Sequence, residues 1–542
     1  VTTLTIDGVV VDRIEQEIRY WEAKPESERN YIYVEDGNYM RDGEIITFFG
    51  INYIPTYNLA ETWFNNFEFY TRQSSYDPDV VWQDLLHMKD IGYNAVSVGL
   101  HGTADKVDSN NMLDLICMCE ELGIYVDLAI RSTNNYDGKY IYFTEQAGRD
   151  LVLLQHFYEN DNIIAYDLCW ERGIGSYEGG FLGRKRWDAD WRTWIDNQYG
   201  SVEHAEKLWG CSVTRDTSGQ VIGLSDSIIN DPTRSQLAMV AAYYRFMDDM
   251  TAKEFTELVN YMKTLDPNHL ISFRMNMSGS GMTTNTWKPQ RVCYDFNGLS
   301  TSMDFMAPEA YALSASDPKS MLQVLFTNAY ARYAAPDAPV VWKEFGTSVW
   351  TGSNFDANDN IMKLTQAEAL RTQYEYFYKS YTSATYVWWY DGGYRVNERS
   401  DYGIINPDGS ERPSTAVIRE YADKFINQGE RPAPDVIIEI DRNGIFYLLH
   451  KLQAVILFFI SNIKEAYDHT RLILGQLKCG HMYITLDRQK TVIKRQLSAA
   501  RMYIRSAIRD RMYEGIRDAI QLCVSLVEAA NSYTYTDMVN TV

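Results

Sequence analysis

The apolar positions of the chain fall into a repeating pattern, in which a short β-rich run is followed by a longer stretch with helical spacing. Apolar runs bounded by Pro, Gly or Asn predict strands buried on both faces, and apolar residues that recur at helical spacing predict amphipathic helices. The predicted strands are 45–53, 93–100, 124–131, 162–170, 270–276, 302–309, 338–346 and 383–390. The predicted helices are 77–92, 111–123, 144–160, 235–263, 316–335, 364–381 and 413–427.

The alternation of strands and helices predicts the fold class. Strands separated by helices pair in parallel, and eight strand–helix units are the number that closes a (β/α)8 TIM barrel. A doubly wound open sheet is the alternative. It would need a glycine-rich phosphate loop after the first strand, and the sequence F-G-I-N-Y-I-P does not supply one.

Turn signals and changes of composition divide the chain into three parts. Residues 36–44 carry two Asp-Gly turn signals and predict a hairpin, so residues 1–44 are expected to form an N-terminal β segment. The barrel is expected over 45–430, with an insertion at 172–235 that is rich in Gly, Trp and Asp. After a Pro-rich linker, residues 431–542 have a helical pattern with Arg-rich faces. Such faces fit an accessory segment packed on the acidic barrel or on a second subunit, which makes a homo-oligomer a candidate assembly.

Charge and hydropathy narrow the classes of partner. The formal net charge is 51 − 73 = −22, which argues against nucleic acid or an anionic membrane as a partner. The most apolar run, 445–463, is interrupted by His450, Lys451 and Gln453, so a buried or partner-facing helix is expected there rather than a membrane span. The 40 Tyr and 13 Trp are expected to fill the core for the most part, but they also suit stacking on sugar rings.

The seven cysteines are scattered and include no C-x-x-C pair. Neither a zinc site of the usual spacing nor a disulfide framework is therefore expected, and no cofactor is predicted. Unpaired cysteines favour a cytoplasmic location, whereas a leader removed before Val1 would make the protein a secreted one.

Polar residues gather at the predicted C-terminal tips of the barrel strands, which is the face where (β/α)8 barrels hold their active sites. These candidate site residues are Asn52, Tyr53, His101, Arg131, Trp170, Glu171, Arg274, Asn276, Glu309, Tyr311, Glu344, Trp389 and Asp391. The set combines carboxylates, planar donors and aromatic platforms, and it contains no metal-ligand cluster. The sequence has no G-x-S-x-G motif and its histidines are spread out, so a carbohydrate substrate and hydrolysis by two carboxylates are the predicted chemistry.

Two glutamates at strand tips, Glu171 and Glu344, are the predicted catalytic pair. Hydrolysis needs one protonated acid and one ionised nucleophile or base. Tyr311 is placed to keep Glu344 ionised by a hydrogen bond, whereas the apolar approach through Trp170 favours the neutral form of Glu171. Glu171 is therefore expected to be the acid/base and Glu344 the nucleophile.

A buried ion pair is the alternative interpretation of either glutamate. Its candidate partners are Arg131, Arg172 and Arg274. Lys343 is a poor partner for Glu344, because adjacent side chains on a strand point to opposite sides.

The order of several motifs resembles clan A of the glycoside hydrolases, whose catalytic glutamates end strands four and seven. Residues 36–55 look like the clan's approach to its first strand, and 191–210 look like a segment that follows strand four in the family-42 β-galactosidases. Residues 388–394 and 401–414 resemble the clan's run from strand eight into the last helix. The resemblance covers residues 35–428 and extends to related β-glycosidases and β-mannanases.

The resemblance implies a retaining β-glycosidase that cleaves O-glycosidic bonds of β-linked oligo- or polysaccharides. By this resemblance Glu171 is the acid/base and Glu344 the nucleophile that forms a glycosyl-enzyme. Tyr311 and Trp389 match the positions that touch the nucleophile and stack on the sugar.

The sequence departs from the clan at two positions. Trp170 stands where the clan usually has an Asn that grips the sugar 2-hydroxyl, and Ser97 stands where an Arg is frequent. Arg131 and Arg274 are the candidate substitutes for that Arg. The zinc-binding cysteine cluster of family 42 is absent from the sequence. These departures leave a catalytically inactive carbohydrate-binding or scaffold barrel as the alternative function.

Overall fold

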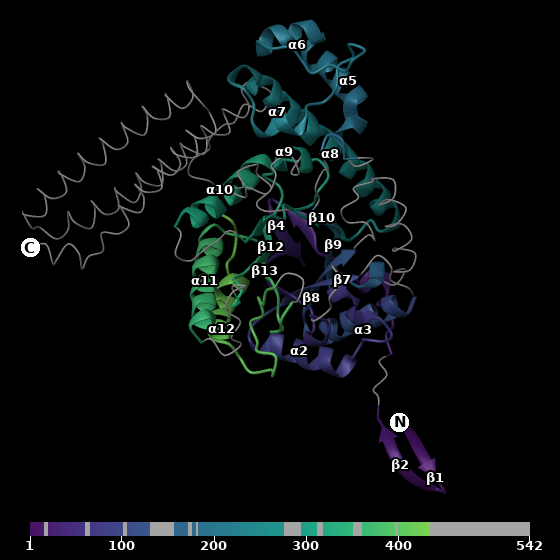
Figure 1. The fold of residues 1–542 in the computed structure, drawn as a ribbon. Coiled ribbons are helices and arrows are strands. Elements are labelled where there is room, and N and C mark those ends of the chain that lie inside the picture. Colours follow the sequence, from purple (N-terminus) through teal and green to yellow (C-terminus); the bar gives the residue numbers. More distant parts are fainter. Residues whose placement is uncertain are drawn as a thin grey trace, which may run out of the picture.

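In the computed structural model, one sheet of eight parallel strands is surrounded by helices (Figure 1). The structure describes residues 1–15, 20–59, 66–100, 106–130, 157–171, 176–179, 183–275, 294–311, 318–350, 360–395 and 399–433. The strands of this sheet are β6 (Phe48–Asn52), β7 (Ala95–Leu100), β8 (Tyr125–Ile130), β9 (Ile163–Trp170), β10 (Leu270–Arg274), β11 (Glu309–Ala310), β12 (Val341–Phe345) and β13 (Ala384–Val387). The helices are α1 (Thr56–Leu59), α2 (Pro78–Asp90), α3 (Lys106–Leu122), α5 (Asp188–Tyr199), α6 (Val202–Trp209), α7 (Asp226–Asn230), α8 (Leu237–Leu265), α9 (Phe296–Leu299), α10 (Pro318–Ala334), α11 (Asn360–Lys379) and α12 (Pro413–Ile426).

The sheet closes into a barrel. Its strand order is β10-β9-β8-β7-β6-β13-β12-β11, so neighbours in sequence are neighbours in space. The two end strands are joined by hydrogen bonds from the Met275 N–H to the Ala307 carbonyl (3.0 Å) and from the Asp304 N–H to the Ile271 carbonyl (2.9 Å). The predicted (β/α)8 barrel is confirmed.

The predicted elements agree with the structure in place and type, with one marked difference in the sixth strand. A strand was predicted over 302–309, yet β11 contains only Glu309 and Ala310. Pro308 has no N–H to give to a neighbouring strand, which limits regular pairing on its N-terminal side. Before it, Met306 still forms an isolated parallel bridge with Val340. The predicted helix 144–160 lies outside the described residues, except for a short 3-10 turn at Phe157–Glu159.

A small antiparallel sheet precedes the barrel and is made by β3 (Tyr33–Glu35), β4 (Asn38–Arg41) and β5 (Glu44–Ile46). The predicted turns at 36–44 connect these strands. Asp36 and Gly37 both have positive φ (49° and 73°), as the central residues of a type I′ turn require. A separate hairpin, β1 (Thr2–Ile6) and β2 (Val9–Ile14), lies at the N-terminus.

The small sheet closes the N-terminal end of the barrel. Tyr39 of β4 packs edge-on against Phe48, at 5.2 Å between ring centroids, and against Phe305 at 5.7 Å. The same apolar cluster contains the first residues of five barrel strands, which are Phe48, Ala95, Leu270, Val341 and Ala384. Water is thereby kept from one end of the barrel, and the C-terminal end is left for the site.

Charged side chains are paired inside the barrel. Lys343 of β12 forms an ion pair with Asp127 of β8 and lies 3.8 Å from Asp167 of β9. Arg274 of β10 continues the series, with its Nε 3.3 Å from the Asp167 carboxylate. These four side chains are at most 2% exposed. Since β8 and β12 are not neighbours, the first pair crosses the barrel interior.

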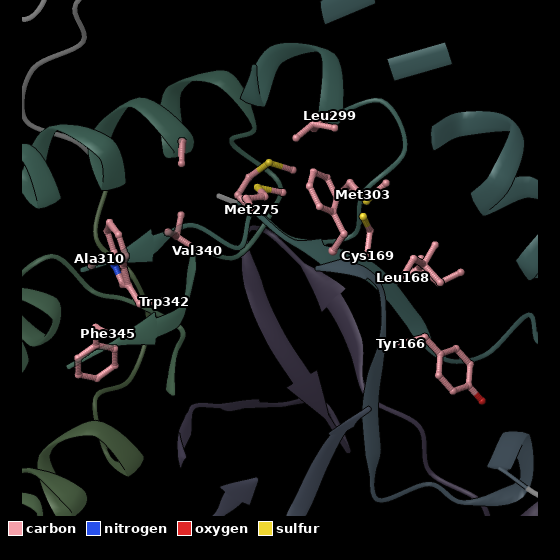
Figure 2. Close-up of a cluster of buried hydrophobic side chains, with 14 of the residues drawn as sticks. Tyr166, Leu168, Cys169, Met275, Leu299, Met303, Ala310, Val340, Trp342 and Phe345 are labelled. Atoms are coloured by element: carbon pink, nitrogen blue, oxygen red, sulfur yellow. The ribbon is translucent and has the colours of Figure 1, made fainter. Parts of the chain in front are cut away.

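An irregularity in β12 turns two consecutive charged residues inward. The pairing of β12 with β13 changes register between Trp342 and Phe345. Trp342 and Phe345 both face outward, where they pack against Phe377 of α11 with centroid distances of 5.1 and 4.8 Å (Figure 2). Lys343 and Glu344, which lie between them, both face the interior. The expected alternation of inward and outward side chains is therefore wrong at this point, because the register shift places two residues instead of one between Trp342 and Phe345. Lys343 nevertheless pairs with Asp127 and not with Glu344.

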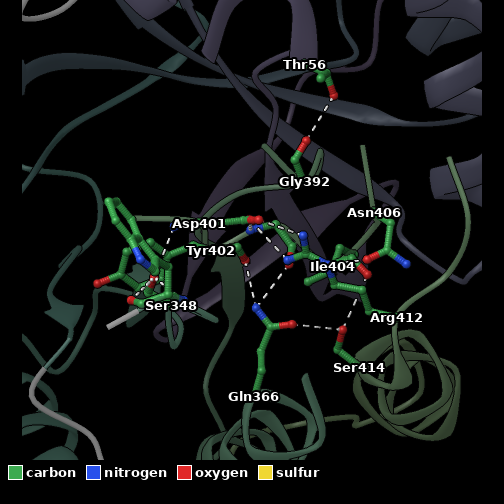
Figure 3. A network of polar contacts seen from close by, with 12 residues as sticks. Thr56, Ser348, Gln366, Gly392, Asp401, Tyr402, Ile404, Asn406, Arg412 and Ser414 are labelled. Carbon is green, nitrogen blue, oxygen red and sulfur yellow. Dashed lines mark hydrogen bonds and ion pairs between the residues drawn. The ribbon is translucent and has the colours of Figure 1, made fainter. Parts of the chain in front are cut away.

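A polar network fixes the chain between β13 and α12 (Figure 3). Arg412 makes two hydrogen bonds to the carboxylate of Asp401, at 3.1 and 2.7 Å. The Gln366 amide on α11 donates to the carbonyls of Thr347, Tyr402 and Gly403 at 3.0 to 3.1 Å. The network holds Tyr402 beside the strand tips.

None of the helices that the structure describes is long and apolar enough to cross a membrane. The apolar run 445–463 and the rest of the accessory segment from residue 434 onward lie outside the described residues. The predicted helical, accessory or oligomerisation role of that segment stays a prediction.

Candidate active site

Three glutamates lie together at the C-terminal end of the barrel. Glu171 follows β9, Glu309 belongs to β11 and Glu344 belongs to β12. One carboxylate oxygen of each lies within 4.8 Å of one oxygen of both others. Glu309 and Glu344 are also register partners on neighbouring strands. The structure thus brings the two predicted catalytic residues together and adds a third carboxyl group.

Glu171 leaves the strand in an unusual backbone conformation. Its φ is +50°, in the left-handed region that residues with a side chain rarely adopt. Its N–H donates to the carbonyl of Arg274 at 2.9 Å, which fixes this turn to β10. Strained backbone of this kind is frequent at functional positions.

Glu344 is the more strongly held of the two predicted catalytic residues. It is 2% exposed. One oxygen lies 2.5 Å from Nη1 of Arg274, and the other accepts a hydrogen bond from the hydroxyl of Tyr311. Burial raises the pKa of Glu344 to about 7, the Glu171 carboxylate adds to this rise, and Arg274 and Tyr311 oppose it.

Arg274 connects the glutamates to the barrel interior. Its backbone N–H and its Nε both donate to Asp167, at 2.8 and 3.3 Å, and Nη2 donates to Ser97 at 2.8 Å. The guanidinium lies over the ring of Trp170, 3.6 Å from the centroid. Glu344 and Asp167 raise the pKa of Arg274, so the guanidinium stays charged. The expected ion pair of a strand-tip glutamate with Arg274 is therefore present in the structure.

Aromatic rings border a pocket beside Arg274. The pocket is lined by Asn52, Tyr53, Ile54, Tyr70, Ser97, Val98, Gly99, Trp170, Arg274 and Trp388. Trp170 meets Trp388 edge to face, with the ring centroids 5.4 Å apart. Apolar rings with a few polar groups between them are typical of a small-molecule site.

A family of known proteins matches the part of the chain that builds this site. Residues 135–377 match the family model Glyco_hydro_42, which is described as beta-galactosidase. The matched segment runs from before β9 into α11 and contains all three glutamates. No curated protein sequence matches the chain.

Several solved structures of glycosidases are similar to this chain. One is a GH2 β-galacturonidase from Eisenbergiella tayi bound to galacturonate, at 12% identity and TM-score 0.44, covering 72% of this chain and 54% of that one. Another is the exo-β-1,4-mannosidase Op5Man5 from Opitutaceae bacterium strain TAV5, at 14% identity and TM-score 0.43, covering 73% of this chain and 62% of that one. The chain thus spans between about half and two thirds of the length of these proteins.

Three predicted site residues make contacts within the barrel itself. The Asn52 amide donates to the carbonyls of Lys343 and Val387 at 3.0 and 3.1 Å, and Asn52 is 2% exposed. The Tyr53 hydroxyl donates to Asp84 at 2.8 Å. Asp391 accepts from the N–H of Thr56 at 3.1 Å, and burial together with Asp84 raises its pKa. Asn52 and Tyr53 also line the pocket. The predicted roles of Asn52, Tyr53 and Asp391 in substrate binding stay predictions.

Three other predicted residues, His101, Arg131 and Asn276, lie outside the described residues. Their predicted contacts with substrate stay predictions.

Trp388 is a residue that the sequence analysis missed. The predicted stacking residue, Trp389, is completely buried and packs on Tyr402 at 5.5 Å between centroids. Its neighbour Trp388 lines the pocket, and the predicted stacking role of Trp389 stays a prediction. The W-W pair marks the position in the sequence, but it does not say which ring faces the pocket.

Among the residues that the structure describes, two groups of side chains have the spacing of metal ligands. The first is the glutamate cluster. The second is His87, Asp90 and Glu411. Its two carboxylates are already paired with the guanidinium of Arg419, which donates to Asp90 at 2.9 Å and to Glu411 at 2.6 Å.

Replacing Tyr311 by phenylalanine is expected to raise the pKa of Glu344. The lost hydrogen bond stabilises the ionised carboxylate, so the acid limb of the pH profile of kcat/KM should move to higher pH by about one unit, and activity on the acid side should fall about tenfold. The profile is measured with an aryl β-glycoside. Tyr421→Phe is a matched control, because Tyr421 makes a similar hydrogen bond to Glu375 at 2.7 Å away from the site. An unmoved acid limb in Y311F would show that the bond does not tune Glu344.

Proposed function

We propose that this protein is a retaining β-glycosidase that uses Glu344 as nucleophile and Glu171 as acid/base. The observation that carries the proposal is the closeness of the two carboxyl groups, because one oxygen of Glu171 lies within 4.8 Å of one oxygen of Glu344. Retaining enzymes hold their carboxyl groups about 5–5.5 Å apart, whereas inverting enzymes hold them about 6.5–9.5 Å apart to admit a water molecule. The short separation favours retention.

The surroundings of the two glutamates support these roles. Glu344 faces a guanidinium and a hydroxyl donor, both of which stabilise the anion that must attack the sugar. Glu171 follows Trp170 at the end of β9 and lies in the same cluster as Glu344, which makes it the partner for the role of acid/base.

The proposed reaction has two steps. The Glu344 carboxylate attacks the anomeric carbon while Glu171 gives its proton to the glycosidic oxygen, so the leaving alcohol departs and a glycosyl ester remains. Glu171, now ionised, then takes a proton from water, whose oxygen attacks the same carbon. The ester bond breaks, Glu344 is released as a carboxylate, and Glu171 is protonated again. Two inversions give a product of retained β configuration.

The substrate is proposed to be a β-linked sugar held against aromatic rings. Trp170 and Trp388 both line the pocket beside Arg274, and sugar C–H faces pack on aromatic rings. We propose Trp388 as the stacking platform, because it lines the pocket. Arg274, which reaches Ser97, is proposed to take the place of the Arg that the clan frequently has on its second strand.

A panel of aryl β-glycosides, led by the β-galactoside, tests the activity. Nuclear magnetic resonance of the first product should show the β anomer, and a 2-deoxy-2-fluoroglycoside should label Glu344, as read by mass spectrometry of peptides. An α product would refute retention, and a label on another residue would refute the role of Glu344.

A catalytically inactive sugar-binding barrel is the second candidate. One observation favours it: Trp170 covers Arg274 at the position where the clan usually places an Asn for the 2-hydroxyl. Binding of oligosaccharides without hydrolysis, together with absence of the fluoroglycoside label, would support this candidate.

A further inference from the structure

Glu309 is a buried carboxyl group for which the proposed reaction has no use. It is 1% exposed, and neither of its oxygens accepts a hydrogen bond from any residue that the structure describes. It nevertheless lies with Glu171 and Glu344, one oxygen of each being within 4.8 Å of the others. A buried carboxylate without donors is costly, so the group must be stabilised in another way.

Among the described residues, the cations nearest Glu309 are each paired with another carboxylate. Lys343 is paired with Asp127, and Arg274 is paired with Asp167 and Glu344. Tyr311, two residues further along the chain, gives its hydroxyl proton to Glu344.

Protonation resolves this imbalance. A neutral carboxyl group has one O–H to donate, and the oxygens of both catalytic glutamates lie in its vicinity. The structure assigns to Glu309 the role of a positioning residue, which keeps its proton through the reaction and donates its O–H to whichever catalytic glutamate is ionised. The direction of the pKa agrees: burial raises it well above its usual range, Glu344 and Glu171 raise it further, and Arg274 opposes them.

The assignment rests on the proposed function and explains how the site handles charge. In the resting enzyme the O–H of Glu309 supports the Glu344 carboxylate. In the glycosyl-enzyme Glu344 is an uncharged ester and Glu171 has lost its proton, so the O–H supports Glu171 instead. Glu309 gains and loses no proton in either step, and the proton balance of the reaction is unchanged.

The variants Glu309→Gln and Glu309→Leu test whether Glu309 acts as a neutral hydrogen-bond donor or as a negative charge. Glutamine keeps the shape, the neutrality and an N–H donor, so E309Q should retain kcat/KM within about threefold of the wild type. Leucine removes the donor, so E309L should lose at least about tenfold, and both limbs of its pH profile should move up by about one unit as the ionised glutamates lose support. If E309Q falls as far as E309L, the charge of Glu309 is needed and the assignment is overturned.

Thermal unfolding tests the same assignment without any substrate. Below about pH 4, Glu309 is protonated in both the folded and the unfolded chain. The difference in Tm between E309Q and the wild type should therefore not change with pH in that range. As pH rises past the ordinary glutamate pKa, the unfolded chain ionises while the folded protein keeps its proton, so the wild type loses stability that E309Q keeps. The Tm of E309Q relative to wild type should therefore rise between pH 4 and pH 8.

The control is Glu368→Gln on α11, whose side chain is 69% exposed, and its Tm should follow the wild type across this range. Parallel Tm curves for E309Q and wild type would overturn the assignment even if E309L does not fold. Absence of hydrolysis by the wild type, with a rising Tm difference for E309Q, would refute the proposed function alone.

Discussion

Replacing Glu344 by glutamine is expected to abolish hydrolysis while leaving the barrel folded. The amide cannot form the glycosyl ester, and loss of a nucleophile of this kind lowers kcat by roughly 10⁴-fold or more. The measurement is the hydrolysis rate of the best aryl β-glycoside, with circular dichroism and Tm as checks on the fold.

Glu171→Gln is the matched variant, because it should fail differently. With an activated aryl leaving group the first step needs no acid, so the glycosyl-enzyme should form and accumulate. Azide, which needs no base, should then restore turnover and give a β-glycosyl azide, whereas E344Q should show no such rescue. Turnover near that of the wild type in either variant would refute the proposed roles.

Replacing Arg274 by methionine is the change expected to affect stability most. It would leave the buried carboxylates of Asp167 and Glu344 without their common partner and remove the hydrogen bond to Ser97. Breaking a buried ion pair by removing one member costs about 3–5 kcal/mol of unfolding free energy. Urea unfolding at pH 7 measures this loss, and hydrolysis should fall with it.

Arg371→Met is the control for that experiment. Arg371 pairs with Glu420 on the surface, where both side chains are about 40% exposed, and such pairs contribute about 0–1 kcal/mol. A loss in R274M no larger than that in R371M would show that the interior charges are not coupled as the contacts indicate.

The barrel could be predicted from the sequence because its strands are local patterns. The run at 338–346 is apolar, β-rich and bounded by Pro339 and Gly346, and the structure forms β12 inside it. The same holds for 162–170, which contains β9. A glutamate at the end of such a run is conspicuous, because the apolar residues of the strand offer its carboxylate no hydrogen-bond donor or counter-ion. The candidate pair could therefore be proposed from the sequence alone.

The partners of those glutamates could not be predicted, because they depend on register around the barrel. Arg274 contacts residues of three other strands, β7, β9 and β12, and no spacing in the sequence expresses that arrangement. The inward turn of both Lys343 and Glu344 depends on a register shift against β13. Glu309 was recognised as polar, but its isolation from every described donor is a property of the folded barrel.

The small sheet β3–β5 bears on where the folding unit of the barrel begins. Its side chains complete the apolar layer under the first residues of the barrel strands, and the Lys343–Asp127 pair lies in the interior that this layer separates from solvent. A barrel excised at Phe48 would admit water to that layer. For domain transplantation or fusion, the smallest transferable unit therefore starts upstream of the first barrel strand, at about Ile32. Its N-terminal boundary is set by the apolar layer that the small sheet completes, and not by the (β/α)8 repeat.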